Sequence, residues 1–181
     1  ESALSGVRNL TAHGYAWYRR SFALPSALAP AGDGGRLLLH FEAVDWEAHV
    51  CVLSLSTRYA RARMKSPRGE AEALPTRLRM LRYGDGALVG SHAGGYDPFE
   101  IDVTDAVDGA NGETVELVVG VFDPSDGGVQ PSGKQKCADL AHAFGVSYTC
   151  SSGIWQPVWL ERTPGAVALP SDALRLVPLG A

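Results

Sequence analysis

The feature that most constrains the fold of this 181-residue chain is its division into short apolar runs bounded by turn-forming residues. The runs are rich in Val, Leu and Phe and are separated by clusters of Gly, Pro, Asn and Asp, which is the pattern of strands joined by loops. This pattern predicts an all-β sandwich. The expected strands are residues 17–24, 36–42, 48–53, 86–91, 99–103, 113–122, 154–162 and 173–178.

About eight strands suit a jelly roll. Residues 113–122 form the most continuous apolar run and are expected at a central position, buried on both faces. Asp-Gly and Asn-Gly dipeptides between residues 105 and 113 predict a loop before that strand. Six side chains on expected strands or corners are predicted to be largely buried: Trp17, Phe41, Trp46, Phe99, Val119 and Trp159.

The bulk composition excludes several classes of protein. Hydrophobic residues make up 45% of the chain and charged residues 20%, and no apolar run approaches the length of a membrane span. A net charge of −4 argues against a nucleic-acid surface, and the first residues resemble no secretory signal. The three cysteines have no metal-binding spacing. Free thiols in a reducing compartment are favoured, with a disulfide between Cys137 and Cys150 as the alternative.

Four segments carry a family resemblance. They read WYRRSF at 17–22, LLHFEAVDWEA at 38–48, GGYDPFEIDVT at 94–104 and SGIWQPVWLE at 152–161. In this order they resemble the N-terminal sugar-binding domain of glycoside hydrolase family 2, the family of β-galactosidases, β-glucuronidases and β-mannosidases. The resemblance implies a galactose-binding-like jelly roll over residues 1–181, without catalytic residues of its own. Catalysis in that family is retaining, and its two glutamates come from a TIM barrel further along the chain.

The motif residues have structural interpretations as well. Trp17, Tyr18 and Phe22 alternate with arginines, which favours core packing on one side and surface ion pairs on the other. Asp45 and Trp46 lie at a corner between strands, where Asp can cap the turn and Trp can fill the end of the sandwich. Residues 96–98 read as a turn that enters the strand at 99–103.

The candidate binding residues lie late in the chain. Residues 123–145 lack apolar periodicity and predict a long excursion at one edge of the sandwich, where binding groups usually lie. The resemblance implies that the region just before residue 152 approaches the barrel's active site, so Trp155 and Gln156 are candidates, although core packing is favoured for Trp155. An acidic residue that reaches the sugar in several family members corresponds to Ser147 here, so that contact is not transferred. The remaining candidates in the loop are Asp123, Asp126, Lys134 and Gln135.

One segment departs from the family pattern. Residues 53–83 contain eight basic and two acidic residues, a net charge of +6, so the rest of the chain carries about −10. This long basic insertion is interpreted as a solvated loop, as a product of a gene-model error, or as an arm that docks on an acidic partner or nucleic acid. If the flanking strands are neighbours, the insertion leaves and re-enters the sandwich at nearly the same place, and the sandwich should survive its replacement by a short turn.

Two functions follow from the sequence. The leading hypothesis is a non-catalytic carbohydrate-binding domain whose partners are a carbohydrate and a neighbouring catalytic barrel. The alternative is a stand-alone β-sandwich that serves as a protein-interaction or structural module. No cofactor, metal or membrane is expected, and a nucleic-acid partner is not favoured. The chain alone is expected to hydrolyse no nitrophenyl glycoside.

Overall fold

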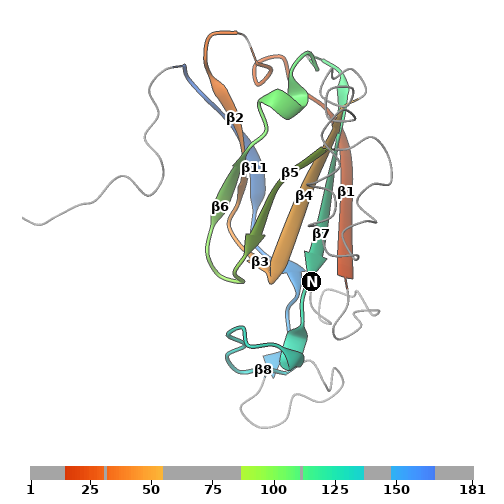
Figure 1. Ribbon diagram of the computed structural model, residues 1–181, viewed down its shortest axis with the longest axis vertical. Helices are drawn as coiled ribbons and strands as arrows, with labels where there is room; N and C mark the ends of the chain where they lie inside the picture. The colour runs from red at the N-terminus through yellow and green to blue at the C-terminus, as the bar shows by residue number, and fades with distance from the viewer. Residues whose placement is uncertain (1–14, 31, 55–86, 111, 137–147, 166–181) are drawn as a thin grey trace, which may run out of the picture.

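The structure, a computed structural model, describes residues 15–30, 32–54, 87–110, 112–136 and 148–165. Two antiparallel sheets face each other as the layers of a β-sandwich (Figure 1). The four-stranded sheet has the order β1-β7-β4-β5, and its strands are β1 (Tyr15–Ala23), β4 (Glu47–Ser54), β5 (Ala87–Ala93) and β7 (Thr114–Phe122). The three-stranded sheet has the order β11-β2-β6, with β2 (Arg36–Phe41), β6 (Phe99–Asp102) and β11 (Val158–Thr163). The all-β sandwich expected from the sequence is confirmed.

Short elements close the two ends of the sandwich. The 3₁₀ turn η3 (Asp105–Val107) lies at the upper end in Figure 1 and buries Ala106 and Val107. At the lower end, β3 (Val44–Asp45) pairs with β10 (Gly153–Ile154). Below them are the 3₁₀ turn η4 (Ser125–Gly127) and the parallel pair of β8 (Gln135–Lys136) and β9 (Tyr148–Thr149). The excursion after β7 therefore lies at an end of the sandwich, and not at the edge that the sequence predicted.

The core follows the period-two pattern of the strands. Leu37, Leu39 and Phe41 of β2 are buried together, as their alternation predicted. They face the buried valines of β4 and β7, and the ring of Phe41 stacks on that of Phe99 at 4.7 Å between centroids. β7 lies between β1 and β4, so its expected central position is confirmed. On its inner face Val115, Val119 and Val121 are buried and Leu117 is partly buried. On its outer face Glu116, Val118 and Phe122 are partly exposed, so the expected burial of both faces is wrong, because the outer face of that sheet is only partly covered.

Two tryptophans that were expected in the core lie outside it. Trp17 is 46% exposed and Trp159 is 42% exposed, so these two predictions are wrong. In both strands the side chains alternate between the two faces, but the tryptophan lies on the outer face. The next residue, Tyr18 after Trp17 and Leu160 after Trp159, packs on the core instead. Phe41 and Val119 are buried as predicted. Trp46 and Phe99 are half-buried.

The strand pairing around the insertion is confirmed, since β4 and β5 are antiparallel neighbours. The insertion itself, the expected strand at 173–178, Ser147 and Cys137 lie wholly or mostly outside the described residues. Cys51 is buried and keeps its thiol, as expected. Cys150 is disulfide-bonded, so the expectation of free thiols is wrong for that residue. Its partner lies outside the described residues.

Candidate functional site

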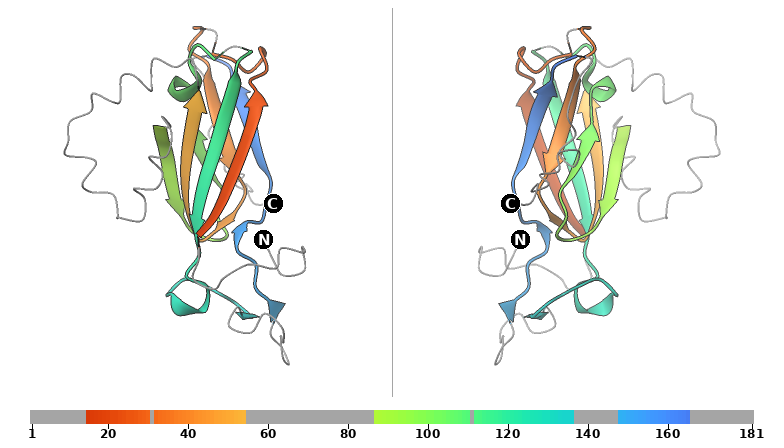
Figure 2. Two further views of the ribbon diagram at one scale, coloured as in Figure 1. Left: turned by 90° about the vertical axis from the view of Figure 1, so that its right-hand side faces the viewer. Right: turned by 90° about the vertical axis from the view of Figure 1, so that its left-hand side faces the viewer.

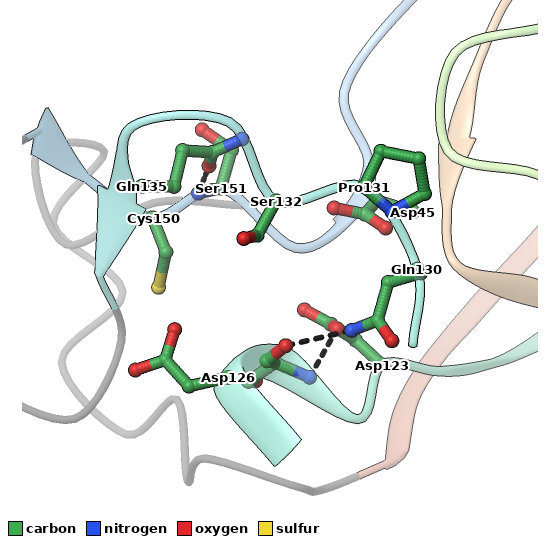
Figure 3. A pocket seen from close by; sticks show the side chains of 10 residues that line it. Asp45, Asp123, Asp126, Gln130, Pro131, Ser132, Gln135, Cys150 and Ser151 are labelled. Atoms are coloured by element: carbon green, nitrogen blue, oxygen red, sulfur yellow. Dashed lines mark hydrogen bonds between the residues drawn. The ribbon is translucent and has the colours of Figure 1, made fainter. Parts of the chain in front are cut away.

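A small acidic hollow lies at the lower end of the sandwich, where the chain leaves β7 (Figure 3). Its lining comes from three places in the sequence: the corner after β2, the excursion that follows β7, and the segment between β9 and β10. The lining residues are Asp45, Asp123, Ser125, Asp126, Gln130, Pro131, Ser132, Gln135, Cys150 and Ser151. We call this feature the acidic hollow.

A shifted pKa distinguishes Asp45 in the hollow. Burial of its carboxyl group, followed by the negative charge of Asp123, raises the pKa of Asp45 from 3.8 to about 6. The two residues are 78 positions apart, and the backbone holds them together because Trp46 N–H donates a hydrogen bond to the carbonyl oxygen of Phe122. The peptide bond between Asp45 and Trp46 is cis. Near neutral pH the hollow therefore concentrates negative charge at one point.

Hydrogen bonds fix the loop that forms the other walls. The Oδ1 atom of the buried Asp123 accepts a hydrogen bond from the backbone N–H of Ser125 at 2.6 Å. The side-chain amide of Gln130 donates to the carbonyl oxygen of Ser125 at 2.6 Å. Across the hollow, Gln135 Oε1 accepts from the backbone N–H of Ser151 at 2.6 Å. These bonds fix η4 against Asp123 and Gln130, and they fix β8 against Ser151 on the other side of the hollow.

The size of the hollow limits what it can hold. Its free volume is about 20 Å³, which is room for one water molecule or one hydroxyl group. The lining combines carboxylates, amides and serine hydroxyls, and none of the described residues that line it is Lys or Arg. Such a site accepts hydrogen bonds from a neutral hydroxyl donor and repels an anion.

Two exposed aromatic side chains lie at the same end of the molecule. Trp155 is 41% exposed and Tyr96 is 50% exposed, and their rings meet edge to face at 6.0 Å between centroids. The indole N–H of Trp155 donates to the carbonyl oxygen of Gly95 at 2.8 Å. The Oδ1 atom of Asp45 lies so close to Gly95 that a Cβ atom there would come within 2.8 Å of it. Gly95 thus connects the aromatic pair to the acidic hollow.

The structure brings together three of the six residues predicted from the sequence. Asp123, Asp126 and Gln135 line the hollow, whereas Lys134 is exposed and does not. Trp155 lies beside the hollow and is not packed in the core, which corrects the favoured interpretation. Gln156 is half-buried and is not among the lining residues.

Sequence reasoning missed Asp45 and Gln130 as parts of the site. Asp45 was interpreted only as a cap of a corner turn, and no local pattern distinguishes a capping Asp from one that faces a second carboxylate. Gln130 lies within the excursion that was identified, but its role depends on Ser125 and could not be read from spacing. The only usable signal was the position of both residues at chain reversals.

No group of three or more His, Cys, Asp or Glu side chains is placed to hold a metal ion within the described ranges. The same part of the chain has no helix that is both long and apolar enough to cross a membrane. A larger hollow, of about 360 Å³, lies near the upper end and is lined by Arg36, Val89, Asp102, Thr104, Asp105 and Ala106. None of the predicted binding residues lines it, and Arg36 already faces Asp102 at 4.0 Å. The acidic hollow is therefore the candidate site.

No protein-family model and no curated protein matches the chain. Among solved structures, it is similar to a protein provisionally named β-galactosidase from Bacteroides fragilis (24% identity, TM-score 0.48, 84% of this chain and 15% of that chain). It is also similar to a β-glucuronidase from Bacteroides uniformis (20% identity, TM-score 0.47, 84% of this chain and 12% of that chain). A third is a glycosyl hydrolase family 2 member from Bacteroides cellulosilyticus (20% identity, TM-score 0.47, 83% of this chain and 13% of that chain).

The chain thus spans only 12–15% of the length of these three solved proteins. The three TM-scores lie below 0.5, so this similarity by itself assigns no function to the chain. The chain is similar, over more than four fifths of its length, to a short part of a protein provisionally named β-galactosidase, of a β-glucuronidase and of a glycosyl hydrolase family 2 member.

Proposed function

We propose that this chain is a non-catalytic, sugar-binding domain of a family 2 glycoside hydrolase. The observation that carries the proposal is the convergence of Asp45, Asp123, Asp126 and Gln135 in one hollow beside two exposed aromatic rings. Carboxylates and amide oxygens accept hydrogen bonds from sugar hydroxyls, and aromatic faces pack against the apolar side of a sugar ring. The four motifs that resemble the family support the same function.

The ligand we propose is a neutral sugar. Since the hollow has room for a single hydroxyl group, only one hydroxyl of the sugar would enter it, and the ring would remain outside, near Trp155 and Tyr96. A uronic acid would bring its own carboxylate towards Asp123 and Asp126, and the repulsion between like charges would weaken its binding. Of the two substrate classes named for the similar solved proteins, a galactoside therefore fits this hollow better than a glucuronide.

The domain would bind and position a sugar but would not hydrolyse its glycosidic bond. Retaining glycosidases need two carboxyl groups about 5–5.5 Å apart, one of them protonated at the start of the reaction. Asp45 with its raised pKa lies beside Asp123, but the free volume between the lining residues is too small for the glycosidic linkage. The parent protein would supply the catalytic pair from a barrel, as the family resemblance implies.

Nitrogen–proton correlation spectra of the 181-residue chain, titrated with D-galactose and with D-glucuronate, test this proposal. Galactose should shift the amide signals of residues 123–135 and the indole signal of Trp155, with a dissociation constant of about 1 mM or weaker, since one hydroxyl contributes little binding energy. Glucuronate should produce smaller shifts at the same concentration.

The matched variants for this titration are Asp126→Asn and Asp108→Asn. Both remove one negative charge, but Asp108 is exposed and directly follows η3, which closes the opposite end of the sandwich. Asp126→Asn should weaken the response to galactose, and Asp108→Asn should leave it unchanged. Equal responses in the two variants, or stronger binding of glucuronate, would contradict the proposal.

A further inference from the structure

Two large aromatic side chains lie exposed on the outer face of the four-stranded sheet, away from the acidic hollow. Tyr15 and Trp17 lie two positions apart on β1 and therefore point to the same side of the sheet. Tyr15 is 38% exposed and Trp17 is 46% exposed. The left panel of Figure 2 looks onto this face, where β1 and β7 run side by side.

The indole ring of Trp17 lies flat on the neighbouring strand. Gly120 of β7 is directly opposite Trp17, and a Cβ atom at that position would come within 2.8–3.3 Å of three atoms of the six-membered ring. The ring can cover the β7 backbone this closely only because residue 120 has no side chain. One face of the indole is therefore against the sheet, and the other is turned towards solvent.

Tyr15 extends this flat surface. Its ring is inclined by only 24° to that of Trp17, with 6.3 Å between their centroids. Tyr15 is supported in turn by Phe122 of β7, at 5.0 Å between centroids. We call the surface formed by Tyr15 and Trp17, supported by Gly120 and Phe122, the aromatic platform.

Polar side chains border the aromatic platform on two sides. Along β1 and β7, Arg19 pairs with Glu116 at 2.6 Å. On β4, Glu47 and His49 lie opposite Phe122 and Gly120, and their side chains are joined at 2.9 Å. The surface is thus an exposed pair of aromatic rings within a border of hydrogen-bonding groups.

This combination matches the chemistry of a sugar ring in a polysaccharide chain. One side of a pyranose is apolar and packs against an aromatic face, while its hydroxyl groups at the rim need polar partners. The platform is linked to the candidate site through the chain, because Phe122 supports Tyr15 and the next residue, Asp123, lines the acidic hollow.

We propose that the aromatic platform binds a sugar unit of a neutral oligosaccharide or polysaccharide by stacking on Trp17 and Tyr15. The inference rests on the proposed function for its class of ligand, a carbohydrate, but it depends on different residues and a different face of the sandwich. It makes the ligand of this domain a glycan chain and not a single sugar.

Native gel electrophoresis of the 181-residue chain through gels that contain soluble galactan, galactomannan or hydroxyethylcellulose tests the inference. At least one of these neutral polysaccharides should retard the wild-type chain. Trp17→Ala should lower the affinity for that polysaccharide by about tenfold or more, as expected for the loss of one aromatic stacking contact. The matched control is Trp159→Ala, since Trp159 is similarly exposed but lies on the other sheet.

A second variant distinguishes the loss of sugar binding from a folding defect caused by Trp17→Ala. Gly120→Ala keeps both aromatic rings but pushes the Trp17 ring away from the sheet, so it should also reduce retardation, while the circular dichroism spectrum remains that of the wild type. Retardation that survives both Trp17→Ala and Gly120→Ala would overturn the inference. An equal loss in Trp159→Ala, or no retardation of the wild type by any of the three polysaccharides, would do the same.

The same proteins separate this inference from the proposed function. If Asp126→Asn abolishes the response to galactose while Trp17→Ala leaves retardation intact, the acidic hollow binds sugar and the platform does not. If Trp17→Ala removes retardation while galactose causes no shift at the hollow, the platform is the binding surface and the hollow is not.

Discussion

Replacement of Asp45 by Asn should stabilise this protein at alkaline pH and not at acidic pH. The pKa of Asp45 is about 6 in the folded state, compared with 3.8 for an ordinary Asp. Because the folded pKa is the higher one, folding favours the protonated carboxyl group. The protein is therefore most stable, as far as this group is concerned, below pH 3.8, and it loses stability as the pH rises through about 6.

The size of this effect follows from the pKa shift. A rise of about two units corresponds to about 3 kcal/mol between the two protonation states. Asp45 is only half-buried, so solvent screening reduces the expected cost to about 1–2 kcal/mol. For a chain of this size, each kcal/mol shifts the melting temperature by about 2–4 °C. Asp45→Asn should then raise the melting temperature by about 2–8 °C at pH 8.

The assay is thermal unfolding of the wild type and the variant at pH 8 and pH 4, followed by circular dichroism. At pH 4 the difference between the two proteins should nearly vanish, because the folded wild type is then protonated at Asp45. Asp108→Asn, which removes an exposed carboxylate, should show no such pH dependence. A lower melting temperature for Asp45→Asn at pH 8, or an equal gain at both pH values, would refute the reasoning.

Three further predictions concern the sandwich itself. Phe41→Ala should lower the free energy of unfolding in urea by about 3–5 kcal/mol, because Phe41 is fully buried and stacked on Phe99; a loss below 1 kcal/mol would place it outside the core. Tyr18→Phe should lower the same quantity by about 1 kcal/mol, since the Tyr18 hydroxyl accepts a hydrogen bond from Ile154 N–H, and an unchanged urea midpoint would contradict that role. Replacement of residues 55–86 by an Asn-Gly turn should leave the melting temperature unchanged or higher, because β4 and β5 are paired neighbours and loop closure costs only about 0.6 kcal/mol per doubling of length. A clear loss of stability in that variant would show that the replaced residues contribute to the core.

The acidic hollow illustrates why a binding site is harder to predict than a strand. The excursion after β7 was identifiable because it lacks apolar periodicity, so Asp123, Asp126 and Gln135 could be singled out. Asp45 could not be added to them, because the two carboxylates approach each other only where the corner after β2 meets the end of β7. A pKa shift that depends on such a contact has no signature in the local sequence.

The local sequence pattern by itself predicted the β2 strand and the residues that share one of its faces. Leu37, Leu39 and Phe41 alternate with Leu38 and His40, and a strand turns alternate side chains to the same face, so the sequence places these three residues together on one face. Leu38 is buried as well, on the opposite face, so alternation grouped the residues but did not decide which of them are buried. Likewise, the turn dipeptides marked where the chain reverses before β7. These features depend on backbone geometry and on residues close together in the sequence.

Only the tertiary structure decided which face of β1 is inside. Alternation places Trp17 and Tyr18 on opposite faces, but it does not say which face meets the second sheet. The tertiary structure places Tyr18 against the core and Trp17 over Gly120, more than a hundred residues away. The physical reason is that burial is a property of the packed layers, whereas periodicity is a property of one strand.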